Sequence, residues 1–332
     1  MLAARKSRLF RNPSARAGAL VVATLVAFAI FGPTLSRHGP NDSDFVHGLS
    51  LDKAPVGPCA LFPLGADRLC RDVLARLSWG ARLSLLIACA ATFVSATLGA
   101  VVGVVSGWLE GARVRTPWPA LLGVFGGVIA LGLGKPLAAC LAFAAGCAGT
   151  FVARSGGLRI DIDGALMRLV DVLLAFPFLL LLMAIGAALE RTTVLTLLLT
   201  LGVTGWLGIA RLLRARTMQV RALEYVEASR ALGQSTPGIL LNHVLPNVLG
   251  PLVVASTFLL AQMIVADSIL SYLGVGLSPP APTWGRMLLE GQDEYLTAPW
   301  LVIAPGAAIL LSVWGFNLLG EGFRDALDPR NA

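Results

Sequence analysis

The sequence predicts an all-α polytopic membrane protein. Of its 332 residues, 56% are hydrophobic and only 14% are charged, whereas about 45–50% of residues are apolar in ordinary soluble domains. Apolar runs long enough to cross a bilayer alternate with short arginine-containing segments. In a soluble protein the net charge of +7 would suggest nucleic-acid binding, but arginines that border apolar runs instead mark cytoplasmic loops. We therefore expect a lipid bilayer and no nucleic acid as partner.

The first apolar run covers residues 17–35 and follows a basic N-terminal segment. The basic residues are Arg5, Lys6, Arg8, Arg11 and Arg16. They predict a cytoplasmic N-terminus, a first span that leaves the cell, and an extracytoplasmic loop that extends to about residue 80. A cleaved signal peptide is the alternative, but the run is long for a signal core and no small-x-small cleavage site follows it.

The second predicted span covers residues 82–107 and carries small residues that would let a neighbouring helix approach closely. These are Ser84, Ser95, Gly99, Gly103 and Gly107. Cys89 in this span, like Cys140 and Cys147 further on, is interpreted as a small packing residue.

Two more apolar runs, 117–134 and 136–153, follow the second span and are separated by Lys135-Pro136. Arginines flank the pair on both sides, which favours an inserted hairpin at 112–160 that leaves the cytoplasm and returns. Because the runs are short and rich in glycine, a re-entrant hairpin is the alternative. Gly134-Lys135 is not a phosphate-binding loop, since Pro136 replaces the required Ser or Thr. We expect no nucleotide site in this chain.

The remaining predicted spans cover residues 164–190, 193–215, 247–272 and 299–319, which gives eight spans in total. Asp171 near the start of the third shared span is predicted to pair with Arg168 or with a neighbouring helix, and Pro177 is predicted to kink that span. Arg324 and Arg330 place the tail at 321–332 in the cytoplasm.

Three polar residues lie inside or near the outer end of the span at 247–272. These are Gln262, Asp267 and Ser268. Two interpretations stay open: they line a pathway through the membrane, or they satisfy one another within the helix bundle.

The stretch RALEYVEASRALGQSTPGILLNHVLP, residues 221–246, is the most highly charged segment between two apolar runs. Apolar residues at helical spacing predict a first short helix, which Gly233 stops because glycine readily adopts the left-handed conformation. Thr236-Pro237 predicts the start of a second helix that runs toward Pro246. Such a unit cannot bury both its faces in itself, so it would lie on the membrane surface or in a groove of a partner.

Glu227-Ala228-Ser229, Gly233 and Leu245-Pro246 together resemble the EAA loop in the membrane subunits of ATP-binding-cassette (ABC) importers, with Ser229 where a second alanine is usual. The segments EYVEASRALG and HVLPNVLGPL are similar to the corresponding segments of the C-type permease of dipeptide, oligopeptide and nickel importers. Two further segments resemble that family. They contain Gly65, Asp67, Arg71, Asp72, Arg76, Gly80 and Arg82, and Pro279, Pro280, Pro282, Trp284 and Gly285. The resemblance covers about residues 61–110 and 163–330.

The resemblance implies a type I importer (MetI-like) transmembrane domain at 81–320, with six shared spans plus the inserted hairpin and a cytoplasmic coupling loop at 216–246. It implies a non-enzymatic permease in the cytoplasmic (inner) membrane that pairs with a homologous B-type permease, two cytoplasmic ATPases that bind ATP and magnesium, and an extracytoplasmic solute-binding protein. The implied coupling residues are Glu224, Glu227, Ala228, Arg230, Gly233 and Pro246. Pro279, Pro280 and Trp284 would form an outer loop on which the binding protein docks. The charges around Arg71 and Arg76 would form an interfacial helix with structural ion pairs.

The implied solute is a di- or oligopeptide, with nickel, glutathione or another small solute as alternatives. A stand-alone secondary transporter is a more distant alternative, because the sequence contains no recognisable internal repeat. A membrane-anchored enzyme would need a convergent catalytic or metal cluster, and the three histidines are scattered.

Cys70 stands where the family usually has glycine, and Cys59 lies upstream in the same predicted extracytoplasmic loop. Two cysteines in an oxidising compartment can pair. A Cys59–Cys70 disulfide is therefore the hypothesis, with free thiols as the alternative. A metal site formed with His38 and His47 is not expected, because the spacing fits no standard pattern.

Overall fold

Long apolar helices dominate the computed structural model, which describes residues 12–36, 38–50, 54–111, 113–117, 157–188 and 192–327. Within these residues five helices are long and apolar enough to cross a membrane, and a bent pair would make a sixth span. The five are α2 (Pro13–Phe31), α3 (Val73–Trp108), α8 (Val194–Arg221), α11 (Leu245–Tyr272) and α13 (Trp300–Leu327). The bent pair is α6 (Ile162–Ala175) and α7 (Phe178–Ala188). The prediction of a polytopic helical membrane protein is confirmed.

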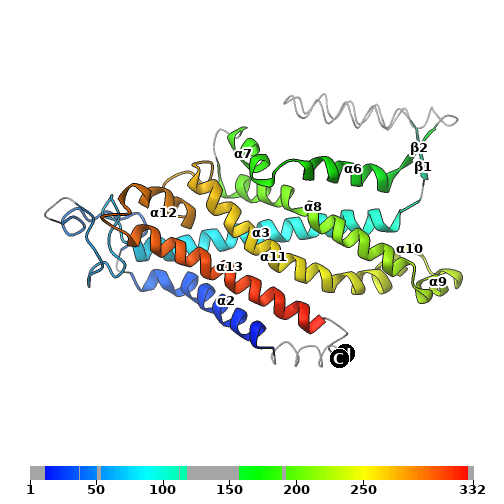
Figure 1. The fold of residues 1–332 in the computed structure, drawn as a ribbon, viewed down its shortest axis with the longest axis horizontal. Helices are drawn as coiled ribbons and strands as arrows, with labels where there is room; N and C mark the ends of the chain where they lie inside the picture. The colour runs from blue at the N-terminus through cyan, green and yellow to red at the C-terminus, as the bar shows by residue number, and fades with distance from the viewer. Residues whose placement is uncertain are drawn as a thin grey trace.

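The helices lie side by side, with α3, α8 and α13 running in one direction and α2 and α11 in the opposite direction (Figure 1). The loop between α2 and α3 lies at one end of the bundle together with α12 (Trp284–Gly291), and we call this the loop end. The short helices α9 (Glu224–Ala231) and α10 (Thr236–Ile239) lie at the opposite end, the α9 end. Helices α2 and α13 form one side of the bundle and α6 lies on the side away from them. Asn12 Nδ2 donates to Asp325 Oδ2 at 2.8 Å, so the start of α2 and the end of α13 meet.

Glycines allow α3 and α8 to pack closely. A Cβ atom at Gly99 would lie 2.7 Å from Ile209 Cβ, and one at Gly103 would lie 3.0 Å from Leu213 Cβ. A Cβ atom at Gly107 would lie 2.8 Å from Thr217 Cβ. The predicted close approach of a neighbouring helix to the small residues of the second span is confirmed, and that neighbour is α8.

Replacing Gly103 by valine is expected to destabilise the bundle by about 2–3 kcal/mol, because the new side chain must push α3 and α8 apart. Thermal unfolding of the purified protein in detergent measures the change. Gly208 of α8 is the matched control, since no atom lies within 4 Å of a Cβ built there. Equal melting temperatures for Gly103→Val and Gly208→Val would contradict the packing argument.

Two short strands depart from the all-α prediction. β1 (Arg113–Pro117) pairs with β2 (Gly157–Asp161) in an antiparallel ladder, with Arg113 opposite Asp161 and Pro117 opposite Gly157. The ladder holds together the two ends of the predicted inserted hairpin. The two additional spans themselves, with Cys140 and Cys147, lie outside the described residues.

Helix α3 begins nine residues before the predicted second span. The side chain of Asp72 accepts a hydrogen bond from Leu74 N at 2.8 Å and caps the helix at its N-terminus. The charged segment around Arg71 and Arg76 therefore leads directly into the span, and the helix predicted there is the first part of α3.

The predicted kink at Pro177 is confirmed but is much sharper than an ordinary proline kink. Helices α6 and α7 meet at 87°, because proline has no N–H to donate and forces the preceding Phe176 into an extended conformation (φ −81°, ψ 133°).

Helix α10 continues into α11 through a π-helical turn at Leu240–Val244. The predicted second helix ending at Pro246 is therefore not a separate element, since one continuous helix runs from Thr236 to Tyr272. The wider π turn accommodates Pro246, which cannot donate a backbone hydrogen bond. The N-cap of α10 is Ser235, one residue before the predicted Thr236.

Candidate functional site

The unit made by α9, the corner at Gly233 and α10 projects at the α9 end of the bundle (Figure 1). Gly233 has φ +82°, its N–H donates to Arg230 O at 3.1 Å, and Gln234 N–H donates to Ser229 O at 3.1 Å. These two bonds form a Schellman motif, which ends α9 as predicted. We call residues 224–239 the α9–α10 unit.

The α9–α10 unit has one buried and one exposed face. Val226 and Ile239 are buried and hold the unit against the bundle. The six residues predicted to couple the chain to a partner are all exposed: Glu224, Glu227, Ala228, Arg230, Gly233 and Pro246. Leu232 is 88% exposed at the corner. The unit therefore presents charged and apolar groups together, as a surface that binds a protein partner does.

Two arginines contact the end of α3: Arg221 at the end of α8, and Arg230 of the α9–α10 unit. Arg221 Nη1 donates to the carbonyl oxygens of Trp108 and Glu110, both at 2.9 Å. The Arg230 guanidinium lies 5.1 Å from the centre of the Trp108 ring, in a cation–π contact. Arg230 therefore links α9 to the end of α3, while Arg221 links the ends of α8 and α3 to each other.

His243 joins the two arms of the α9–α10 unit, although sequence reasoning did not single it out. Its Nε2 lies 3.3 Å from Ser229 Oγ and 3.1 Å from Gln234 Oε1. Ser229 Oγ already donates its proton to Tyr225 O at 2.8 Å, so it can only accept from His243. Gln234 Oε1 is also an acceptor, and Nε2 must therefore carry a proton. His243 lies in the π turn, a kind of irregularity that is frequent at functional sites.

Replacing His243 by phenylalanine is expected to loosen the corner, because the aromatic ring remains near Tyr225 while the Nε2–H donor is lost. Loss of this hydrogen bonding costs about 1 kcal/mol, so amide hydrogen exchange in residues 224–236 should become about fivefold faster. His243→Gln is the control, because its amide N–H can still donate. Equal exchange in the wild type and in His243→Phe would contradict the assigned hydrogen bond.

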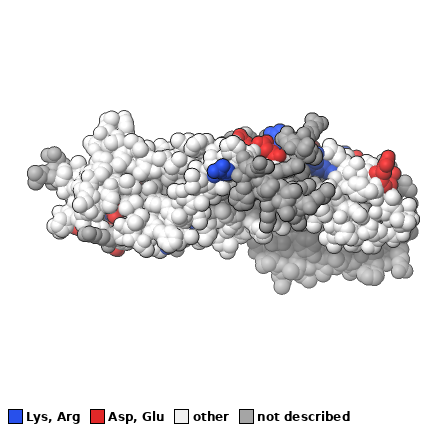
Figure 2. Space-filling model, turned by 90° about the horizontal axis from the view of Figure 1, so that it is seen from below, with Lys and Arg blue, Asp and Glu red and all other residues white. Residues whose placement is uncertain are grey.

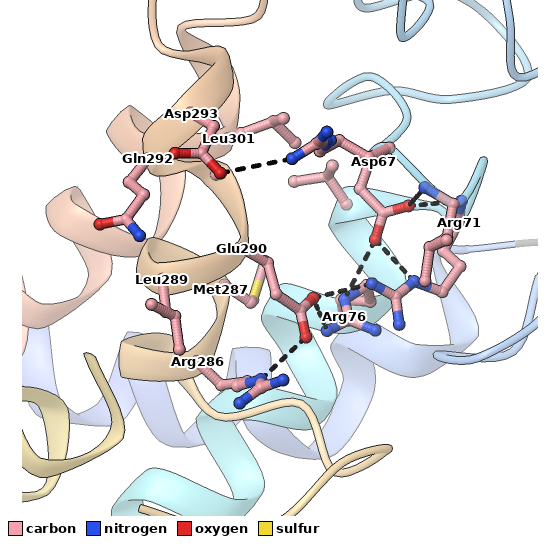
Figure 3. A pocket seen from close by; sticks show the side chains of 14 residues that line it. Asp67, Arg71, Arg76, Arg286, Met287, Leu289, Glu290, Gln292, Asp293 and Leu301 are labelled. Carbon is pink, nitrogen blue, oxygen red and sulfur yellow. Dashed lines mark hydrogen bonds and ion pairs between the residues drawn. The ribbon is translucent and has the colours of Figure 1, made fainter. Parts of the chain in front are cut away.

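A cluster of charged side chains lines a cavity of about 620 Å³ at the loop end. In Figure 3 the Glu290 carboxylate of α12 points toward Arg76 of α3 and Arg71 of the preceding loop. Glu290 Oε2 lies 2.7 Å from Arg71 Nη2 and 2.8 Å from Arg76 Nη2, and Arg286 Nε lies 3.0 Å from Oε1. Asp67 pairs with Arg71 at 2.6 Å. The structural ion pairs predicted for this segment are confirmed.

The charges in this cluster decide the ionisation of Glu290. Burial acts to raise the pKa of its carboxyl, but the Arg76 guanidinium, the hydrogen bond from Arg286 and the charge of Arg71 outweigh burial and lower the pKa below its ordinary value. Glu290 is therefore the anion that holds α12 against α3 and the loop.

Trp284 is not accessible to a docking partner, in contrast to the prediction. Its side chain is completely buried, and its Nε1–H donates to Leu77 O at 3.1 Å. The ring fills the junction of α3 and α12 because its indole N–H finds a carbonyl acceptor there. Pro279 and Pro280 are exposed, so of the three predicted docking residues only these two are accessible.

The three predicted pathway residues of α11 do not act together. Gln262 is exposed, whereas Asp267 and Ser268 are buried. Ser268 Oγ donates to Ile264 O of its own helix at 2.7 Å, and within the described residues neither Gln262 nor Ser268 hydrogen-bonds to the Asp267 carboxyl oxygens. The interpretation that the three residues satisfy one another is therefore wrong.

Cys59 and Cys70 are free thiols, so the hypothesis of a disulfide between them is not borne out. Cys59 Sγ accepts from Phe62 N at 3.4 Å within its own turn, whereas Cys70 is buried close to Gly48. Cys70 has φ +55°, and this left-handed conformation explains why glycine would suit the position. Cys89 is exposed, contrary to its expected packing role. Within the described ranges no group of His, Cys, Asp and Glu could hold a metal ion.

Two known families match two different segments of the chain. The family described as "Binding-protein-dependent transport system inner membrane component" matches residues 145–332, and the "N-terminal TM domain of oligopeptide transport permease C" matches residues 3–55. The helical bundle with its projecting α9–α10 unit thus defines a multi-pass membrane subunit of a transport system. The chain belongs to the family of binding-protein-dependent transport system inner membrane components. Such a permease subunit is not itself catalytic, and the family implies ATP-hydrolysing partner subunits and a binding protein.

Several curated proteins resemble the chain over nearly its entire length. A putative peptide transport system permease protein of Brucella abortus is 32% identical over 97% of the chain and 90% of its own length. The dipeptide transport system permease protein DppC of Bacillus subtilis is 31% identical over 97% of the chain and 84% of its own length. The oligopeptide transport system permease protein OppC of Escherichia coli is 28% identical over 98% and 90%. The similarity extends beyond the motif resemblance, which left out the N-terminal region.

Proposed function

We propose that this chain is the C-type permease subunit of a type I ABC importer for di- or oligopeptides. In this role it pairs with a homologous B-type permease, two cytoplasmic ATPases that bind ATP and magnesium, and an extracytoplasmic solute-binding protein. The choice of peptides rests on the names of the relatives, which are peptide, dipeptide and oligopeptide permeases.

The exposed α9–α10 unit is the observation that carries the proposal. Its exposed face is available to a cytoplasmic ATPase, and Arg230 connects α9 to Trp108 at the end of α3. When the ATPases close around ATP, α9 moves with them and shifts α3 against α8, so the bundle changes between two packings. Differential contacts of α9 in the two states supply the free energy for that change.

The α9 end is the cytoplasmic end in this proposal. Arg211, Arg214, Arg216 and Arg221 near the end of α8 support this orientation. The Asn12–Asp325 hydrogen bond supports termini on one and the same side. The chain then has three parts. Residues 1–80 form the cytoplasmic tail, the first span and the extracytoplasmic loop, residues 81–320 form the permease domain with the coupling loop at 216–246, and residues 321–332 form the cytoplasmic tail. The β1–β2 ladder supports an insertion at 112–160 that leaves and returns at one place, which agrees with two additional spans, eight in all.

The loop end is extracytoplasmic in this orientation. Pro279 and Pro280 remain the proposed contacts of the binding protein because they are exposed there. Gln262 remains a proposed pathway residue because its side chain is exposed. Asp267 and Ser268 are buried, and they could reach the pathway only after a rearrangement of α11.

Purification of the tagged chain from its host in mild detergent tests the proposal. Mass spectrometry should find a second permease and one or two ATPases, and the eluate should hydrolyse ATP faster when the binding protein is added. Uptake of labelled dipeptide, nickel and glutathione by the reconstituted complex separates the solute alternatives. A chain that is recovered without any ATPase, and transports in the absence of ATP, would instead support a stand-alone secondary transporter.

Glu227→Ala is expected to lower ATP-driven uptake about tenfold, because a charge-assisted contact to the ATPase is lost, while the amount of assembled complex changes little. Uptake by proteoliposomes and the recovery of each subunit measure the two effects. Glu321→Ala is the control, since this exposed acid lies on α13 outside the α9–α10 unit. Equal uptake by Glu227→Ala and wild type would remove Glu227 from the coupling surface.

A further inference from the structure

Large apolar side chains are exposed at the loop end on three short segments, residues 45–46, 69 and 295–296. Phe45 and Val46 are 62% and 82% exposed, Leu69 is 51% exposed, and Tyr295 and Leu296 are 59% and 80% exposed. We call these five residues the tip cluster. Single exposed apolar residues are common, but several in one region mark a surface that contacts a partner or a membrane.

Backbone hydrogen bonds and ion pairs hold the three segments of the tip cluster together. Asp44 N, which precedes the first segment, donates to Cys70 O at 3.0 Å, next to the second segment. Arg68 Nη1 lies 3.4 Å from Asp293 Oδ2, and Arg68 Nε lies 3.2 Å from Glu294 Oε1. These two acids directly precede the third segment. The tip cluster therefore belongs to one region of the surface.

The lengths of α2 and α3 place the tip cluster beyond the lipid bilayer. Figure 2 shows few charged side chains on the face seen from below, where α2 and α13 lie, outside the part covered by grey atoms, as expected of a surface in contact with lipid. The 19 residues of α2 extend about 29 Å, which matches the hydrocarbon core. Near the end of α2, Arg82 Nη2 of α3 donates to Ile30 O at 2.8 Å. Helix α3 begins at Val73, about 13 Å further along its axis, whereas a headgroup layer is only about 5–8 Å thick.

Helix α13 leads to the same position independently. The hydrogen bond between Asn12 and Asp325 aligns the start of α2 with the end of α13. Because Trp300 lies 25 residues before Asp325, whereas Phe31 lies 19 residues after Asn12, α13 extends about 9 Å beyond the end of α2. There Trp300 Nε1–H donates to Ala66 O at 3.2 Å, in the loop that carries the tip cluster. Lipid contact therefore does not explain the exposed apolar side chains.

Acidic side chains border the tip cluster. They are Asp42, Asp44, Asp293 and Glu294, and Arg68 already pairs with the last two. A partner that covers this surface needs apolar residues opposite the tip cluster and basic residues opposite the acids. A second permease packs beside the bundle within the bilayer, whereas a soluble protein that approaches from outside meets the tip cluster first.

We propose that the tip cluster is a docking surface for the extracytoplasmic solute-binding protein, with Val46 and Leu296 as its most exposed contacts. This inference rests on the proposed function, from which it takes the binding protein and the orientation of the loop end. It adds a second contact region to Pro279 and Pro280.

Photocrosslinking of the full chain in its host tests the docking surface. Benzoylphenylalanine replaces Val46, Leu296 or Leu310 in three separate variants. Leu310 is the matched control, because it is a leucine with 68% exposure in the membrane-spanning part of α13. Mass spectrometry should find one extracytoplasmic solute-binding protein crosslinked at positions 46 and 296 but not at 310. Crosslinks at 46 and 296 to lipid, to the second permease or to no protein would overturn the proposal, as would an equal crosslink at 310.

The affinity of the crosslinked binding protein for the complex in nanodiscs gives a second test. The double variant Val46→Ala/Leu296→Ala should raise the Kd about tenfold, because exposed apolar anchors carry much of the binding energy of an interface. Leu310→Ala should leave the Kd unchanged, and an equal Kd in the double variant and the wild type would overturn the docking surface. Binding of a labelled dipeptide to the binding protein is measured separately. If that protein bound another solute, peptide import would be rejected while the docking surface would stand.

Discussion

Replacing Glu290 by glutamine is expected to be the most destabilising conservative change at the loop end, at a cost of about 3 kcal/mol. The variant keeps the shape of the side chain but removes the anion that Arg71, Arg76 and Arg286 share. The side chain of Arg76 is only 2% exposed, and its remaining acidic partner, Asp67, lies 3.6 Å away. A buried guanidinium without close compensation is costly, because water cannot replace the lost carboxylate. Thermal unfolding in detergent measures the loss.

Asp293→Asn provides the matched control for this change. Asp293 belongs to the same cavity, but its side chain is 68% exposed and its distance to Arg68 Nη1 is 3.4 Å. Exposed ion pairs of this kind contribute about 0.5 kcal/mol. If Glu290→Gln and Asp293→Asn shifted the melting temperature by the same small amount, the ion-pair network would not be what holds α12 to α3.

The contribution of Glu290 to stability should also depend on pH. The pKa of its carboxyl is lowered in the folded protein, where burial is outweighed by the positive charges of Arg76, Arg286 and Arg71. The unfolded chain therefore binds a proton more readily, and protonation favours unfolding. The contribution is present above the ordinary carboxyl pKa of about 4.3 and is lost as the pH falls through the lowered pKa. The stability difference between wild type and Glu290→Gln should shrink over that range, and a difference that grows would contradict the assigned charges.

Local features of the α9–α10 unit could be predicted from the sequence. Gly233 ends α9 because its left-handed conformation depends on the residue itself and on bonds to Ser229 and Arg230, which lie within four residues. The exposure of Glu227 follows from its place on the polar side of a short amphipathic helix. The apolar runs predicted the spans for a similar reason, since length and hydropathy are local properties of the chain.

Features that depend on distant residues could not be predicted in this way. Trp284 is buried because Leu77 O lies opposite its indole N–H, and 207 residues separate the two. The interpretation of Trp284 as an interfacial residue used only its proline-rich neighbours. Likewise, a proline at 177 indicates an interruption, but the 87° angle depends on how α6 and α7 pack. The π turn at His243 has no sequence signal that we recognise.

Replacing Gly233 by valine is expected to reduce ATP-driven uptake about tenfold or more, because a β-branched residue in the left-handed region costs at least 1–2 kcal/mol. A Cβ atom at this position would meet no atom within 4 Å, so the penalty comes from φ +82° and not from a clash within the chain. The corner must then open, and α9 and α10 can no longer present their surfaces together. Uptake into proteoliposomes and co-purification of the ATPases are the measurements.

Gly233→Asn separates the conformational effect from a contact with the partner. Asparagine adopts the left-handed region more readily than other non-glycine residues, so its uptake should lie close to that of the wild type if conformation alone matters. If the ATPase packs directly on the corner, asparagine should impair uptake nearly as much as valine, since either side chain would fill the space against the partner. Wild-type uptake in Gly233→Val would show that the corner tolerates another geometry, and the coupling role of the α9–α10 unit would then lose its conformational basis.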